Sequence, residues 1–140
     1  MRCTAVLVSA LMISMRAWAF EVVGDGIPLP LTNQVPSAER GFAIAQHRQQ
    51  GLCILCHSIP GSTDRFQGDV STALAGAGSR YTAAQLRLRV ADARRINPES
   101  TMPSFNTTQA RTRVAQAWAG KPLLDAQQVD DVVAWLVTLR

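Results

Sequence analysis

Three residues of this chain carry a chemically specific pattern. Cys53 and Cys56 lie three positions apart, and His57 follows the second cysteine directly. Two thiols at this spacing on one helical turn can add to the two vinyl groups of one porphyrin, while the adjacent imidazole meets the iron. The motif therefore predicts one covalently bound haem c, with Cys53 and Cys56 as its thioethers and His57 as the proximal iron ligand.

Close cysteines also have three other common uses. A thioredoxin-like dithiol needs a strand before the motif and a βαβ pattern around it, and neither is visible here; a simple disulfide stays open. A zinc site needs four ligands, and beyond the first residues of the chain only His47 and Met102 could add nitrogen or sulfur. The sequence favours haem over all three alternatives.

The first residues have the pattern of a secretory signal. A basic start precedes an apolar run from Cys3 to Met15, and the run ends in Ala17-Trp18-Ala19, the small-x-small form that a signal peptidase cuts. The run is too short to span a membrane, so we expect residues 1–19 to be a cleaved signal peptide. An exported chain with covalent haem is expected in the periplasm, where bacterial cytochromes mature.

Removal of this leader changes the charge and the ligand inventory. The formal charge falls from +4 to +2, because the leader holds two arginines and no acidic residue. Two haem propionates would offset that charge, so the basic balance gives no argument for nucleic acid or for an anionic membrane. One methionine, Met102, is left after the leader.

Met102 is the predicted distal iron ligand. It lies in a segment broken by Pro98 and Pro103, far enough past His57 for the chain to round the haem edge. Coordination by histidine and methionine raises the reduction potential and leaves no open position, which favours one-electron transfer over catalysis at the iron. His47 is the rival ligand, although its polar neighbours are typical of a solvated side chain.

The rest of the chain predicts an all-α domain over residues 37–140. We expect a helix capped by Ser37 that runs to Gln50, a second opened by the capping box Thr82-Ala-Ala-Gln85 that runs to Arg94 or Arg95, and a third from Asp125 to the C-terminus. Residues 58–80 and 96–105 read as loops, because they are rich in glycine, proline and small polar residues. Such loops would cover the haem.

Residues 20–36 form a predicted extended arm. Three prolines and two glycines deny this segment a helix, yet it is rich in valine, isoleucine and leucine. An apolar exported segment of this kind is expected to be buried somewhere. Packing on its own domain and wrapping around a partner are equally open.

The order of helix, Cys-x-x-Cys-His, long loop, Met-Pro and C-terminal helix resembles class I cytochrome c. The resemblance implies that the first and last helices cross, with Phe42 or Ala45 meeting Trp135. Members often carry Gly-Pro-x-Leu after the haem motif, where a backbone carbonyl accepts the histidine N–H. This chain has Ser71-Thr-Ala-Leu74 instead, so the resemblance assigns that role to the carbonyl of Thr72.

Within that class, the chain resembles the SoxX family, the monohaem subunits of SoxAX complexes in periplasmic thiosulfate oxidation. The arm from Val22 to Thr32, the run Arg94-Arg-Ile-Asn-Pro98 and Thr101-Met-Pro103 carry this resemblance. It implies a heterodimer with a SoxA-like cytochrome subunit, a transient SoxYZ-like carrier and an electron-accepting cytochrome. It also implies that the catalytic cysteine belongs to the partner, so that this chain is no enzyme on its own.

Three functions follow from these patterns. The first is an electron-transfer subunit of a sulfur-oxidising enzyme, and the second is a free diffusible cytochrome that serves a terminal oxidase. The third is a haem enzyme or gas sensor, which would require Met102 not to bind the iron. Only the apolar arm favours a permanent partner over free diffusion.

Overall fold

The protein is described by a computed structural model that covers residues 20–108 and 114–140. The predicted leader lies outside these residues. The α-helices are α1 (Ala38–Gln46), α2 (Ala77–Arg80), α3 (Ala83–Asp92) and α4 (Ala126–Leu136), with 3₁₀ turns at η1 (Cys53–Leu55), η2 (Ala93–Arg95) and η3 (Gln116–Trp118). Within the described residues, β pairing is limited to an isolated bridge between Val23 and Gly26. The expectation of an all-α fold is confirmed.

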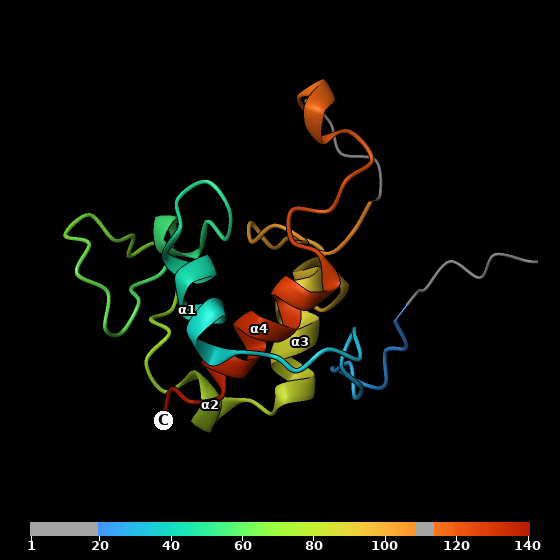
Figure 1. Cartoon of the computed structure of the whole chain (residues 1–140), viewed down its shortest axis with the longest axis horizontal. Coiled ribbons are helices and arrows are strands. Elements are labelled where there is room, and N and C mark those ends of the chain that lie inside the picture. Colours follow the sequence, from blue (N-terminus) through green and yellow to red (C-terminus); the bar gives the residue numbers. More distant parts are fainter. Residues whose placement is uncertain (1–19, 109–113) are drawn as a thin grey trace, which may run out of the picture.

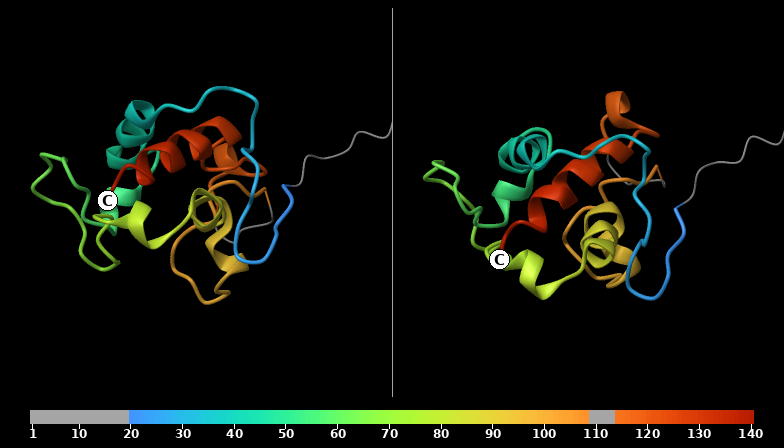
Figure 2. Two further views of the ribbon diagram at one scale, coloured as in Figure 1. Left: turned by 90° about the horizontal axis from the view of Figure 1, so that it is seen from below. Right: turned by 60° about the horizontal axis from the view of Figure 1, so that its bottom comes forward.

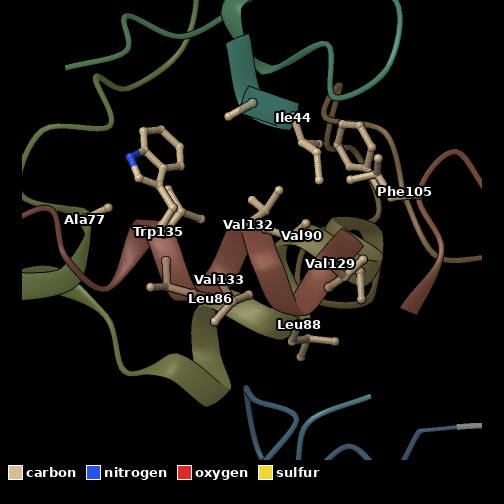
Figure 3. Close-up of a cluster of buried hydrophobic side chains, with 14 of the residues drawn as sticks. Ile44, Ala77, Leu86, Leu88, Val90, Phe105, Val129, Val132, Val133 and Trp135 are labelled. Atoms are coloured by element: carbon tan, nitrogen blue, oxygen red, sulfur yellow. The ribbon is translucent and has the colours of Figure 1, made fainter. Parts of the chain in front are cut away.

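Helix α4 is the centre of the fold, because it packs against both α1 and α3 (Figures 1 and 2). The predicted capping box at its start is present, since the side chains of Asp125 and Gln128 each accept a hydrogen bond from the other residue's backbone N–H. One face of the helix is buried, with Val132 and Trp135 among its apolar side chains (Figure 3). The helix ends at Leu136, a few residues before the predicted end at the C-terminus.

The crossing of α1 with α4 depends on a glycine. A Cβ atom at Gly41 would lie 2.0 Å from the backbone oxygen of Asp131, so only glycine allows the two backbones to approach this closely. Beside the crossing, the rings of Phe42 and Trp135 pack with centroids 5.7 Å apart and planes tilted by 50°. The expected contact between the first and last helices is therefore confirmed.

Helix α1 ends earlier than the sequence predicted. It stops at Gln46 rather than Gln50, because His47 adopts an extended conformation and its N–H bonds back to Ile44. The chain then doubles back beneath the helix, where a Cβ atom at Gly51 would lie 2.1 Å from the backbone oxygen of Ile44. Leu52 follows with a positive φ of 61°. This reversal leads the chain directly into the Cys-x-x-Cys turn.

Helix α3 begins with the predicted capping box of Thr82 and Gln85. The α-helix ends at Asp92, and the 3₁₀ turn η2 carries the coil on to Arg95. The side chains of α3 pack against α4 from the side opposite to α1 (Figure 3). Among them, Arg87 is buried and donates to Asp130 of α4 at 2.8 Å.

The arm packs on its own domain. Ile27 is only 2% exposed, and its N–H donates to the carbonyl of Ala84. The guanidinium of Arg87 donates to the carbonyl of Ile27, and the backbone N–H groups of Leu31 and Thr32 donate to the carboxylate of Asp130.

Between and beyond these anchors, Leu29 is 73% exposed and Val35 is 85% exposed. The arm is thus attached to α3 and α4, while part of its apolar surface faces solvent.

None of the helices in the described parts of the chain has the length and apolarity needed to cross a membrane.

Candidate haem-binding site

One apolar cavity brings together the four residues that the sequence singled out. Cys53, Cys56 and His57 line it from the turn after α1, and Met102 lines it from the loop after η2. The remaining wall is mainly apolar and comes from the haem-motif turn, the loops, α3 and α4; it includes Leu52, Leu74, Val90, Phe105, Leu124, Val132, Trp135 and Leu136. Side chains distant in sequence therefore share one site.

The Cys-x-x-Cys segment forms a single tight turn. The backbone N–H groups of Cys56 and His57 both donate to the carbonyl of Cys53, at 3.1 and 2.9 Å. This turn keeps both thiols and the imidazole on the wall of one cavity. Both cysteines are free thiols, so neither is committed to a disulfide.

The two thiols differ in their surroundings. Burial raises the pKa of the Cys53 thiol to about 11, whereas Cys56 is exposed. Cys53 is therefore a neutral thiol at physiological pH in this apolar wall, and a thioether at the same position would also be uncharged. Leu55, between the two thiols, is 44% exposed. The second thiol thus marks the edge of the cavity that lies at the protein surface.

The imidazole of His57 is oriented by the backbone carbonyl of Thr72. Nδ1 of His57 lies 2.6 Å from this oxygen, and because a carbonyl can only accept, Nδ1 carries the proton. Nε2 is then the unprotonated nitrogen, the form required of a metal ligand. The role that the class I resemblance gave to the Thr72 carbonyl agrees with this geometry.

Four further hydrogen bonds hold the Thr72 segment in place. On the side of the haem motif, the N–H of Ser71 donates to Cys56 and the N–H of Leu74 donates to Ser58. On the other side, the guanidinium of Arg80 donates to the carbonyls of Ala75 and Ala73, at 2.6 and 2.9 Å. Arg80 thus stiffens a loop that lacks the family's proline. Sequence analysis missed it, because an arginine at the end of a Gly- and Ser-rich loop has no local signal for this role.

Met102 is half-buried in the loop that connects η2 to the rest of the chain. Its N–H donates to the hydroxyl of Ser100 at 3.2 Å, and Pro103 follows it on the cavity wall. The segment is irregular, as predicted, since the two prolines exclude a helix.

His47, the rival ligand, lies elsewhere. It is exposed at the end of α1, and its Nδ1 accepts a hydrogen bond from the N–H of Gln49 at 3.2 Å. It is absent from the cavity wall that holds His57 and Met102. The structure therefore does not bring His47 to the site.

The residues present fit a covalent haem. The cavity offers two thiols at the attachment spacing, an imidazole with a fixed tautomer, a thioether and a mainly apolar wall. A porphyrin needs an apolar enclosure for its faces and donor atoms for its iron, and the residues of this cavity could provide both.

The family model for cytochrome c matches residues 38–140. The chain therefore belongs to the cytochrome c family, an electron-transfer class, and it carries covalently bound haem c in an all-α, class I cytochrome c-like fold. Among solved structures, the chain is similar to a chain of SoxXA from P. pantotrophus, with 36% sequence identity and a TM-score of 0.78. The match covers 86% of this chain and 93% of that chain, so the resemblance to SoxX is confirmed. A comparison with curated proteins found no match.

Proposed function

We propose that this chain is the electron-transfer subunit of a SoxAX-type complex, in which Cys53 and Cys56 hold the haem and His57 and Met102 ligate its iron. The observation that carries the proposal is the single apolar cavity lined by all four of these side chains. When bound, haem c supplies a centre that accepts and releases one electron at a time.

The residues around the cavity suit electron transfer better than catalysis. Two protein ligands leave no position for a substrate, and the apolar wall keeps water away from the site. His57 is fixed by the Thr72 carbonyl, so its ligand nitrogen needs little rearrangement when the charge of the site changes. The exposed Cys56 and Leu55 mark the edge at which an electron can pass to another protein.

The similarity to SoxXA supports a SoxA-like cytochrome subunit as the stable partner, and with it a role in periplasmic thiosulfate oxidation. A SoxYZ-like carrier and an electron-accepting cytochrome would then be transient partners. Both cysteines beyond residues 1–19 belong to the haem motif, so the catalytic cysteine of such a complex would come from the partner. The same proposal includes export of the chain and cleavage of residues 1–19.

A second candidate is a free diffusible cytochrome that donates electrons to a terminal oxidase. The anchoring of Ile27 and Leu31 on the chain's own domain favours it, because the apolar arm no longer demands a partner. The two candidates share the haem site and differ in whether a stable complex forms.

Met102→Ala tests the ligand assignment. We expect the wild-type protein to show the sulfur-to-iron charge-transfer band in its oxidised spectrum, and the variant to lose it, to have a lower reduction potential and to bind carbon monoxide. Mass spectrometry of both proteins should show one haem that survives denaturation. A wild-type spectrum without the sulfur band would contradict ligation by Met102.

The partner is tested with surface substitutions in the arm. Deleting the arm would remove the buried Ile27, whereas Leu29→Ser and Val35→Ser change exposed side chains and leave the anchors intact. We expect co-purification of a SoxA-like cytochrome with the wild-type protein and weaker co-purification with the double variant, at an unchanged haem spectrum. Rapid reduction of an oxidase without any stable partner would establish the free carrier instead.

A further inference from the structure

The loop that carries Met102 is attached to α3 immediately after the methionine. Ser104 is buried, and its hydroxyl donates to the carboxylate of Asp92 at 2.5 Å. Asp92 is the last residue of α3, so its position is set by a helix that packs against α4. Pro103 is the residue that separates Met102 from Ser104, and its ring fixes φ. Few soft dihedral angles therefore lie between the Asp92 bond and the thioether.

The chain on either side of this bond differs in how firmly it is held. After Ser104, the N–H groups of Phe105 and Asn106 donate to the last turn of α3, at Val90 and Ala91, with distances of 3.3 and 3.0 Å. Before Met102, residues 96–99 are exposed, and the bonds near the methionine are local: its N–H donates to the hydroxyl of Ser100 at 3.2 Å, and the N–H of Ser100 donates to Asn97 at 2.9 Å. The bond from the Arg94 side chain to the carbonyl of Ser100 is long at 3.5 Å. Among these bonds, the one at Ser104 is the nearest to Met102 that ties the loop to α3.

We propose that Asp92 is a positioning residue for the distal ligand: through the hydroxyl of Ser104, it holds the Met102 thioether on the wall of the haem cavity. A hydrogen bond from a hydroxyl to a carboxylate is charge-assisted and among the stronger side-chain contacts. This inference rests on the proposed ligation by Met102. It adds that the strength of this ligation is set by the end of α3.

The consequence is a change in how often the thioether leaves the iron. If the bond between Asp92 and Ser104 is lost, the loop retains Phe105 and Asn106 as anchors but gains freedom at Ser104. The state in which Met102 is detached should then become about tenfold more populated, the effect expected for losing one hydrogen bond to a charged group. An added ligand that binds only that state gains apparent affinity by the same factor.

The test is a titration of the oxidised holoprotein with imidazole, followed by loss of the sulfur-to-iron band. We expect Ser104→Ala and Asp92→Ala each to bind imidazole about tenfold more tightly than the wild type. The double variant should be little different from either single variant, because both remove the same bond. Asp92→Asn, whose neutral amide oxygen can still accept from Ser104, should bind imidazole with an affinity between those of the wild type and Asp92→Ala.

Thr32→Val is the matched control. The hydroxyl of Thr32 donates to Gln127 at 2.6 Å and accepts from the N–H of Gln34 at 3.2 Å, so its loss removes side-chain hydrogen bonds from a segment that does not line the haem cavity. This variant should bind imidazole with wild-type affinity, even if it melts at a lower temperature. An equal gain in affinity for Thr32→Val would overturn the positioning role and indicate a general loss of stability.

Ligation by Met102 and the positioning role of Asp92 can be tested separately. A wild-type protein without a sulfur-to-iron band would overturn ligation by Met102 itself. A wild-type protein with the band, together with a Ser104→Ala variant whose imidazole affinity is unchanged, would overturn the role of Asp92 alone. If Asp92→Ala does not fold, Ser104→Ala decides, since it deletes a single oxygen atom.

Discussion

At the scale of single residues, the loop that orients His57 shows how the chain replaces a missing proline. The Thr72 carbonyl that orients His57 lies in a loop without the family's Gly-Pro-x-Leu pattern, and Arg80 supplies two side-chain hydrogen bonds to the same loop. A planar guanidinium can bind two carbonyls at once, whereas a lysine is a point donor. The stiffness of this loop therefore comes from a side chain rather than from a ring in the backbone.

This arrangement predicts the behaviour of the His57 ring proton. Arg80→Met keeps much of the side chain but removes its donors, so the loop should move and the bond from Nδ1 to Thr72 should open more often. We expect the Nδ1 proton to exchange with solvent roughly fivefold faster, the change expected from about 1 kcal/mol of lost hydrogen bonding. NMR exchange measurements on the reduced holoprotein would show it.

Arg80→Lys is the control for charge. Its ammonium group can reach one carbonyl, so the Nδ1 proton of His57 should exchange more slowly than in Arg80→Met. An exchange rate unchanged in Arg80→Met would mean that the backbone bonds of Ser71 and Leu74 hold the loop without help.

Asp131 gives the fold a defined sensitivity to acid. Burial by itself would raise the pKa of this carboxyl, but hydrogen bonds from Arg40, the N–H of Ser37 and Gln127 outweigh burial and lower it. Because the folded pKa lies below the unfolded value, the carboxylate's contribution to stability is complete above about pH 4 and is lost as the pH falls through the folded pKa.

Asp131→Asn should therefore flatten the acid side of the stability curve. We expect the free energy of unfolding of the wild type to decrease below about pH 4, and the variant, less stable at pH 7, to lose less over the same interval. Denaturant titrations of both holoproteins between pH 2 and 7 would measure the difference. Asp69→Asn, at an exposed position, should follow the wild-type curve.

At the scale of elements, the crossing of α1 and α4 is the contact on which the cavity depends. Gly41 allows the close approach of the two backbones, and Trp135, beside the crossing, lines both the core and the haem cavity. A change in the separation of these helices would therefore alter the shape of the haem cavity. The two helices are tied by backbone proximity rather than by side-chain length, so little adjustment is available.

Gly41→Ala should destabilise the protein in spite of alanine's higher helix propensity. The added methyl group meets backbone atoms of α4, and overpacking of this kind costs roughly 1–3 kcal/mol or more, against a gain of about 1 kcal/mol in propensity. We expect a lower melting temperature and a change in the fluorescence of Trp135. Ala43→Val, on the exposed side of α1, should lower the free energy of unfolding only by its helix propensity, less than about 1 kcal/mol.

At the scale of the whole molecule, the haem is expected to be part of the core. The cavity opens between α3, α4 and two loops, and its wall includes Leu124, Val132 and Leu136, which are buried in the structure. Without the haem, these side chains would border an empty or water-filled space. A group that binds only the folded state stabilises that state, so folding and haem attachment are linked.

The double variant Cys53→Ala with Cys56→Ala should consequently yield a largely unfolded or degraded chain. Far-UV circular dichroism and limited proteolysis of the purified protein would show low helicity and rapid cleavage. A single variant that keeps one thioether should remain folded and coloured, which separates loss of haem from loss of a side chain. A cooperative, protease-resistant protein without haem would contradict the linkage.

The sequence by itself determined the features that depend on near neighbours. The Cys53-x-x-Cys56-His57 motif fits a single turn, and the capping boxes at Thr82 and Asp125 join residues three apart, so residue type and spacing are enough to predict them. The same holds for the irregular segment around Met102, because proline interrupts a helix interior and Pro98 and Pro103 lie only five residues apart.

Only the tertiary structure decided the features that depend on distant backbone. The end of α1 at Gln46 follows from the close packing of Gly51 beneath Ile44, and the path of the arm follows from Asp130 and Arg87, which satisfy its backbone groups. The contacts of Arg80 with the Thr72 loop and of Asp92 with the Met102 loop are of the same kind. Such contacts form wherever folding leaves a carbonyl or hydroxyl within reach of a charged side chain, and no local pattern in the sequence records that distance.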